Sequence, residues 1–170
     1  MTHHKGPTMS DHPHPAALHT PPTNKLANLV VSTIRVLEKT PHSLIALLAR
    51  ILIALVFWKS ALTKIEGFSI KDATFLLFEY EYNLPLIPPE LAAYMATLAE
   101  LTFPVLLLIG LASRFSALAL LVMTLVIEIL VYPEAYILHG LWATALLLII
   151  ARGPGILAID YLVRKKYMPE

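Results

Sequence analysis

Ionisable side chains stand inside four long apolar stretches of the sequence, and their types are those that can support chemistry. Arg50, Glu100, Glu128 and His139 each lie in a different stretch. A charge within hydrocarbon costs about 2.5–3.5 kcal/mol on insertion scales, so such residues are candidates for function. By residue count Arg50 and Glu100 differ in depth by roughly 6 Å, within the reach of an arginine. We therefore predict a buried Arg50–Glu100 ion pair, serving either as structural glue or in function.

A second group of polar residues lies near the ends of these stretches that are farther from Arg50. A histidine and a carboxylate exchange protons near neutral pH and could hold the polar head of a quinone. The competing interpretation is that these groups are solvated by lipid headgroups and water, with Lys59 snorkelling to the interface. Within the stretches no two histidines have the i, i+3 or i+4 spacing that would suggest a haem or a di-metal site. Electrons would therefore have to come from a partner protein. The candidate pocket for a quinone or other ligand comprises Lys59, Lys64, Glu128, Tyr132 and His139.

The composition excludes most classes of soluble protein. Of 170 residues 57% are hydrophobic and 15% charged, and the mean hydropathy is +0.68. Soluble domains carry roughly 45–50% apolar and about 25% charged residues, so we predict an integral membrane protein surrounded by the lipid bilayer. The net charge of +1 argues against a nucleic-acid partner. The absence of cysteine excludes disulfides and thiolate metal sites.

The four apolar stretches predict membrane-spanning helices. They lie at about 43–63, 90–111, 115–132 and 136–151, each compared with the ~20 residues that a spanning helix needs. Very short links before and after the third stretch force neighbouring helices to run antiparallel. The predicted fold is therefore all-α, an integral membrane four-helix bundle with up-down-up-down connections.

The remaining segments are assigned around this bundle. Residues between the first two spans predict an interfacial lid helix, begun by the capping-box pattern Ser69-Ile-Lys-Asp72. The predicted organisation is a disordered His- and Pro-rich tail at 1–24, an amphipathic surface helix at 25–42, the membrane domain at 43–163 and a basic tail at 164–170.

The distribution of lysine and arginine predicts the orientation. Eight of these residues lie in the N-terminal flank, the second link and the C-terminal flank. The first and third links together contribute Lys71. Positively charged flanks remain on the cytoplasmic side, so both termini are expected to face the cytoplasm. The N-terminus lacks the features of a signal peptide, and we expect a multi-pass protein of the bacterial inner membrane.

Five histidines fall in the N-terminal tail. Neutral imidazole is a general ligand for copper, nickel and zinc, but scattered histidines without a folded frame bind weakly. The competing interpretation is a solvated tail, and no firm metal site is predicted. The weak candidates are His3, His4, His12, His14 and His19.

Several short motifs occur in a recognisable order. They are Arg50, Phe57-Trp58-Lys59-Ser60, Thr63-Lys64, Leu84-Pro85, Glu100, Gly110 to Arg114, Gly153-Pro154-Gly155 and Asp160. This order resembles the DoxX family of small four-helix bacterial membrane proteins. The sequence around Thr74-Phe75, Glu81 to Leu86 and Tyr132-Pro133 is similar to the branch found beside bufferin-type metal-stress systems. The resemblance implies association with quinone-linked oxidoreductases and oxidative-stress complexes, and assigns no catalytic role to these residues.

Three functional hypotheses follow. The leading one is an accessory subunit of a quinone-linked redox or stress-response system, with a quinone as its candidate cofactor and membrane or peripheral redox proteins as partners. The alternatives are a membrane component that handles or exports a metal-binding peptide and a non-catalytic assembly scaffold. Whether the chain is an enzyme stays open, with a non-enzymatic role favoured for the isolated chain. Whether the chain forms a homo-oligomer also stays open.

Overall fold

The computed structural model describes residues 24–38 and 40–167, and the chain divides into two compact units. The first unit, residues 1–40, contains helix α1 (Lys25–Glu38). None of the α1 side chains is buried within the molecule, including the apolar Leu29 and Ile34. That α1 lies on a membrane surface stays a prediction. The histidines proposed as weak metal ligands lie outside the described residues.

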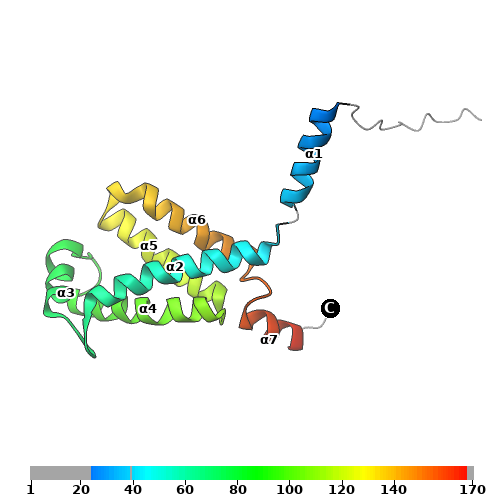
Figure 1. Cartoon of the computed structure of the whole chain (residues 1–170). Coiled ribbons are helices and arrows are strands. Elements are labelled where there is room, and N and C mark those ends of the chain that lie inside the picture. Colours follow the sequence, from blue (N-terminus) through cyan, green and yellow to red (C-terminus); the bar gives the residue numbers. More distant parts are fainter. Residues whose placement is uncertain (1–23, 39, 168–170) are drawn as a thin grey trace, which may run out of the picture. The chain divides into compact units, whose positions relative to one another are not determined.

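The second unit, residues 41–170, is built on four helices long and apolar enough to cross a membrane (Figure 1). Each packs against its neighbour in the chain, and α2 also packs against α6. The 3-10 turn η2 (Pro133–Ala135) leads into the last of them. The prediction of an all-α four-helix membrane bundle is therefore confirmed. The helices are α2 (His42–Lys64), α4 (Pro89–Ile109), α5 (Ser113–Leu130) and α6 (Tyr136–Arg152).

The packing is inverted relative to a soluble bundle. Large apolar side chains such as Leu52, Leu98 and Leu141 point outward and are more than half exposed. Small residues fill much of the interior and let the helix backbones approach closely, which is how helices associate when lipid surrounds them. The buried alanines include Ala46, Ala54, Ala61, Ala93 and Ala117, beside larger core residues Phe57, Leu107, Leu120, Leu146 and Ile149.

A short hairpin and two short helices form a lid between α2 and α4. The hairpin pairs β1 (Ile65–Glu66) with β2 (Ser69–Ile70), and was not predicted. It is followed by α3 (Asp72–Leu77) and the π-helix η1 (Phe78–Tyr82). The predicted capping box is wrong, because the Ser69 hydroxyl donates to the Glu66 carbonyl within the hairpin. We call this end of the bundle the lid end.

The lid is fastened to the end of α2. The carbonyl of Lys64 accepts hydrogen bonds from the Lys71 amide and the Thr74 hydroxyl, each at 3.0 Å. The last carbonyls of a helix have no partner within it, so these two donors cap α2. On the inner side of the lid Phe78 packs with Ala92 and Ala93 of α4. The lid is therefore held by both of the helices that it connects.

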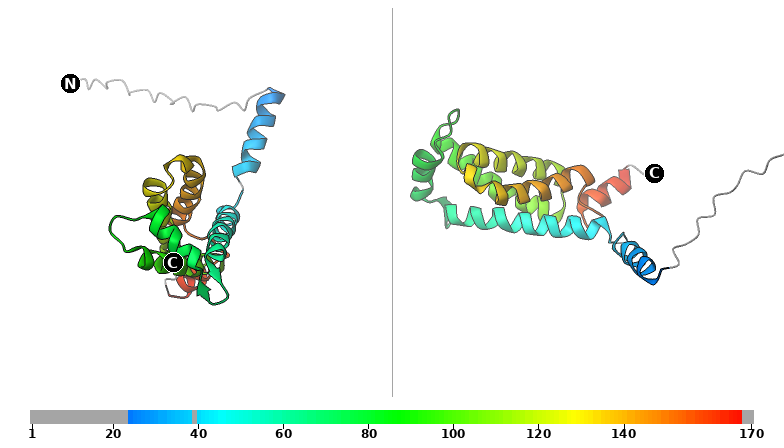
Figure 2. Two further views of the ribbon diagram at one scale, coloured as in Figure 1. Left: turned by 90° about the vertical axis from the view of Figure 1, so that its left-hand side faces the viewer. Right: turned by 90° about the horizontal axis from the view of Figure 1, so that it is seen from above.

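The opposite end of the second unit carries a short helix, α7 (Ile159–Tyr167), which was not predicted (Figure 2). The turn after α4 lies close to the residues before α7. Gly110 has φ +77°, and a Cβ there would lie 2.5 Å from Cβ of Ala158 and 2.8 Å from Nη2 of Arg50. A side chain at Gly110 would be strained and would also displace these neighbours. We call this end the arginine end.

Candidate functional site

Arg50 is 1% exposed and lies at the arginine end of α2. Its guanidinium donates four hydrogen bonds, all to backbone carbonyls. The acceptors are Leu107 at 2.8 Å and Leu108 at 2.7 Å on α4, and Pro154 at 3.2 Å and Leu157 at 2.8 Å after α6. The α4 acceptors lie in its last turn, where carbonyls lack helical partners and the helix dipole favours a positive charge. Arg50 thus caps α4 from a neighbouring helix.

Glu100 does not pair with Arg50, so the predicted Arg50–Glu100 ion pair is wrong. Its carboxylate accepts from Nζ of Lys64 at 2.9 Å and 3.2 Å, and both side chains are almost fully buried. The Lys64 ammonium also donates to the Ser60 hydroxyl at 2.9 Å. Two opposite charges that bond to each other in this way can remain in a dry interior.

The pairing differs from the prediction because the ends of the first two spans are not level. Lys64 is the last residue of α2, whereas Glu100 lies well inside α4, roughly 16 Å along the axis from Pro89 at 1.5 Å per residue. The lid packs beside the part of α4 that extends beyond the end of α2. Side chains of a helix also lean toward its N-terminus, which carries the Lys64 ammonium back into the bundle.

The Lys64–Glu100 pair borders a cavity of about 280 Å³ at the lid end, which we call the lid cavity. Its walls are almost entirely apolar, and Lys64, Tyr82 and Glu100 are its ionisable residues. Met95 and Val122 on its rim are 54% and 53% exposed, so the cavity borders the lipid-facing side of α4 and α5. The remaining lining residues are Phe78, Leu84, Ile87, Ala92, Ala96, Ala99, Ala119, Met123, Val126 and Ile127.

Tyr82 is the ionisable residue of the lid that lines this cavity. Its ring stacks on Phe78 with centroids 4.5 Å apart and meets the ring of Tyr132 at 6.0 Å. Burial is the main cause that raises the pKa of the Tyr82 phenol, the negative charges of Glu100 and Glu81 raise it further, and a hydrogen bond with Tyr132 offsets part of the rise. The phenol therefore remains protonated and can donate a hydrogen bond.

Glu128 and His139 are brought together, away from the lid cavity. His139 Nδ1 lies 2.6 Å from Oε2 of Glu128, and its ring lies 5.0 Å from that of Trp142. His139 is buried and Glu128 partly so, at the lid ends of α6 and α5. The two neighbouring spans thus hold this pair at one depth, as the sequence-based depth argument expected.

Of the five residues of the predicted ligand pocket, Lys64 lines the lid cavity and the other four do not. Lys59 lies on the exposed side of α2. Tyr132, which follows α5, donates to the Glu81 carboxylate of the lid. Sequence spacing gave heights but not rotations about the helix axes, so residues of similar depth were grouped although they face different ways.

The Tyr132–Glu81 contact is expected to depend on pH. Hydrogen bonding to the Glu81 carboxylate is the main cause that raises the pKa of Tyr132 above its ordinary value of 10.0. Because the folded pKa is raised, the stabilising contribution is complete below pH ~10 and is lost as Tyr132 ionises above it. The titration is followed by tyrosinate absorbance. The part of the wild-type signal that is absent from Tyr132→Phe belongs to Tyr132, and it should appear at high pH. It should move toward the ordinary range in Glu81→Gln.

Glu79→Gln is the matched control, since Glu79 is an exposed carboxylate of the same η1 helix. This variant should leave the Tyr132 titration in place. An equal shift in Glu79→Gln and Glu81→Gln would mean that overall lid charge, rather than the hydrogen bond, sets the Tyr132 pKa.

Asp160, one of the family-motif residues, binds the start of α5. Its two carboxylate oxygens accept from the amides of Ala112 at 2.8 Å and Ser113 at 2.7 Å, while its own amide donates to Gly110. A carboxylate at a helix N-terminus satisfies free amides and interacts favourably with the dipole. No local sequence pattern predicts these contacts, because the two amide donors lie 48 and 47 residues away from Asp160 in the chain.

Asp160→Asn is expected to lower the free energy of unfolding by about 1–2 kcal/mol, because the charged acceptor of the α5 terminus is lost. Equilibrium unfolding in mild detergent measures this effect. Glu66→Gln, at an exposed hairpin position, is the control and should change stability little. If the two variants were equally stable, the Asp160 contacts would contribute no more than an ordinary surface charge.

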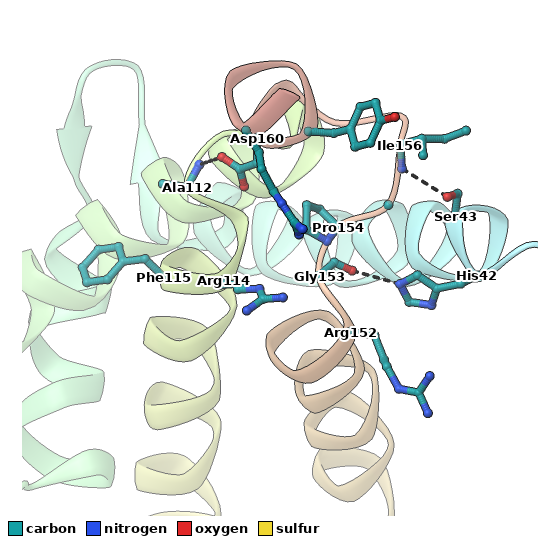
Figure 3. A pocket seen from close by; sticks show the side chains of 13 residues that line it. His42, Ser43, Ala112, Arg114, Phe115, Arg152, Gly153, Pro154, Ile156 and Asp160 are labelled. Atoms are coloured by element: carbon teal, nitrogen blue, oxygen red, sulfur yellow. Dashed lines mark hydrogen bonds between the residues drawn. The ribbon is translucent and has the colours of Figure 1, made fainter. Parts of the chain in front are cut away.

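The Gly153-Pro154-Gly155 motif forms the turn after α6. Gly153 has φ +84°, and its carbonyl lies 3.2 Å from Nε2 of His42. A Cβ on Gly155 would lie 2.8 Å from the Ser43 backbone, so the turn passes tightly against the start of α2. Arg114 lies beside Gly153 at the arginine end (Figure 3). The motif therefore closes the bundle between its first and last spans.

Comparison with known proteins identifies the family of this chain. The DoxX family model matches residues 45–133, from α2 through α5. The chain is also 32% identical over 133 residues to a protein of Haemophilus influenzae described as uncharacterized, covering 71% of this chain and 84% of that relative. No solved structure matches the chain. The matched range, which contains Arg50, Lys64 and Glu100, covers more than half of the chain, and the chain therefore belongs to the DoxX family.

Proposed function

We propose that this membrane protein is an accessory subunit of a quinone-linked redox system and holds a quinone head group in the lid cavity. The observation that carries the proposal is the apolar cavity with a buried ion pair and a phenol at its polar side. A quinone has the matching chemistry, because its ring is apolar and its carbonyls accept hydrogen bonds.

The size and position of the cavity support this ligand class. Ligand pockets measure roughly 300–1,000 Å³, so a cavity of about 280 Å³ suits a single ring better than a whole lipid. The exposed rim at Met95 and Val122 lets an isoprenoid tail extend into the bilayer. Entry of the head group directly from the lipid phase is then possible.

Each polar residue has a defined part in the proposal. The Lys64 ammonium donates to the Ser60 hydroxyl and to both carboxylate oxygens of Glu100, so Lys64 holds the carboxylate in position. The protonated Tyr82 phenol donates to a quinone carbonyl. Reduction of a quinone to a quinol takes two electrons and two protons. The proposal assigns binding to this chain and leaves electron delivery to a partner oxidoreductase in the bacterial inner membrane.

The test is to purify the protein in mild detergent, extract the lipids and quantify quinone per chain. We expect close to one quinone per wild-type chain. Ala99→Leu, which fills the cavity next to Glu100, should remove most of it. Ala151→Leu makes the same change on an exposed part of α6 and should leave the quinone content unchanged. Quinone at the membrane background in the wild type would overturn the proposal and favour a non-catalytic scaffold.

Further variants separate the cavity from the other polar pair. Tyr82→Phe removes one hydrogen bond, worth about 0.5–1.5 kcal/mol, and should weaken quinone retention between twofold and tenfold. Glu128→Gln and His139→Ala should leave retention unchanged because neither residue lines the lid cavity. Loss of quinone in these two variants, with retention in Ala99→Leu, would place the ligand at the Glu128–His139 pair instead.

A further inference from the structure

A second, larger pocket of about 890 Å³ lies at the arginine end (Figure 3) and shares no lining residue with the lid cavity. Positive side chains from three helices line it. Arg114 comes from the first turn of α5, Arg152 is the last residue of α6, and Arg164 belongs to α7. Asp160 is the one carboxylate among the lining residues. The three arginines against one aspartate give the lining an excess of two positive charges.

The Asp160 carboxylate is already committed to the α5 terminus, where both oxygens accept backbone amides. Arg114 stands beside the same terminus, in the first turn of a helix, where a positive charge is disfavoured by the helix dipole. An anion in this pocket would therefore stabilise the arrangement. Guanidinium groups suit a phosphate especially well, because their planar fork donates two parallel hydrogen bonds.

Apolar side chains flank the charged groups. Phe115 and Ile156 line the same pocket and are 62% and 57% exposed. Arg152 ends one spanning helix and Arg114 stands near the beginning of another, so the pocket lies at the level where hydrocarbon gives way to headgroups. A soluble phosphate would gain nothing from Phe115 and Ile156, whereas the acyl chains of a lipid would cover them.

We propose that the arginine end binds the phosphate group of an anionic phospholipid between α5, α6 and α7. Basic pockets between spanning helices bind the headgroups of such lipids in other membrane proteins. The acyl chains lie along the exposed apolar faces of the adjacent spans. This site is independent of the lid cavity and does not depend on quinone binding.

The test measures retention of phosphatidylglycerol by the full chain in an uncharged detergent, using native mass spectrometry, together with the shift in unfolding temperature that the added lipid produces. The double variant Arg114→Gln/Arg152→Gln should bind phosphatidylglycerol roughly thirtyfold more weakly, given the usual contribution of each basic residue. The control Lys165→Gln/Lys166→Gln removes the same charge from α7 residues that do not line the pocket, and should bind as the wild type does.

Two further arms make the result decisive. Arg114→Lys/Arg152→Lys keeps the charge but lacks the planar fork, so its affinity should fall between those of the wild type and the Gln variant if the Gln variant fails through lost binding rather than misfolding. Inorganic phosphate alone should give no comparable stabilisation, and an equal shift would overturn the lipid as the occupant. Equal losses in the two double Gln variants, or equal retention of zwitterionic phosphatidylcholine, would overturn the site itself.

Discussion

Replacing Arg50 with methionine is expected to lower the free energy of unfolding by at least about 4 kcal/mol, because four hydrogen bonds from a charged donor are lost. Each such bond contributes roughly 1.5–3 kcal/mol, and contributions within one network do not add fully. The carbonyls of α4 and of the turn after α6 would remain buried without a donor. Equilibrium unfolding in mild detergent, followed by circular dichroism, measures the change.

Two companion variants sharpen this test. Lys59→Met removes a positive charge from an exposed position of the same helix and should alter stability by less than about 0.5 kcal/mol. Arg50→Lys keeps the charge but replaces the planar fork, so it should fall between the wild type and Arg50→Met. Equal stability of Arg50→Met and Lys59→Met would show that the four contacts contribute nothing to folding.

Lys64→Met is expected to destabilise the protein by about 3–5 kcal/mol, because the Glu100 carboxylate would be left buried without its partner. Replacing Glu100 with leucine at the same time should recover most of the lost free energy of unfolding, since two apolar side chains then replace two charges. The double variant Lys64→Met/Glu100→Leu should therefore be more stable than Lys64→Met alone. The same unfolding measurement compares the three proteins.

The comparison also distinguishes structure from function. A double variant that is stable but has lost quinone would support a binding role for the pair beyond packing. Lys59→Met again serves as the control for removal of a lysine from α2. If the double variant were as unstable as Lys64→Met, the two charges would not be acting as a coupled pair, contrary to their contact at 2.9 Å.

The helices and their connectivity could be predicted because lipid imposes a simple constraint. Every backbone group must be bonded within the span, so long apolar stretches fold as helices. Short links then force antiparallel neighbours, as at Gly110 to Ala112 and at the η2 turn. These are local properties, and they can be read from consecutive residues.

The partners of buried charges could not be predicted, since they depend on relative height and rotation. Arg50 was matched with Glu100 on the assumption that adjacent spans end at one level, whereas α4 continues past the end of α2. Its real acceptors are backbone carbonyls, which every residue possesses and which therefore give no sequence signal. Asp160 bonding to the Ala112 and Ser113 amides is hidden for the same reason.

The contact of Glu128 with His139 shows the intermediate case. A tight connection between α5 and α6 kept their depths comparable, so height could be counted from the turn. The rotation that brings the side chains within 2.6 Å of each other came from packing. The relative depth of two residues can therefore be predicted across a short turn, but not across a long connection such as the lid.

The contacts of Arg50 also bear on how the protein is made. All four acceptors come later in the chain, between 57 and 107 residues after Arg50 itself. During synthesis α2 therefore enters the membrane before its guanidinium has any native partner, and the last acceptor exists only after all four spans have been translated. Until then the insertion machinery or water must solvate this charge. Biogenesis of the bundle is complete only when the residues after α6 close over its first helix.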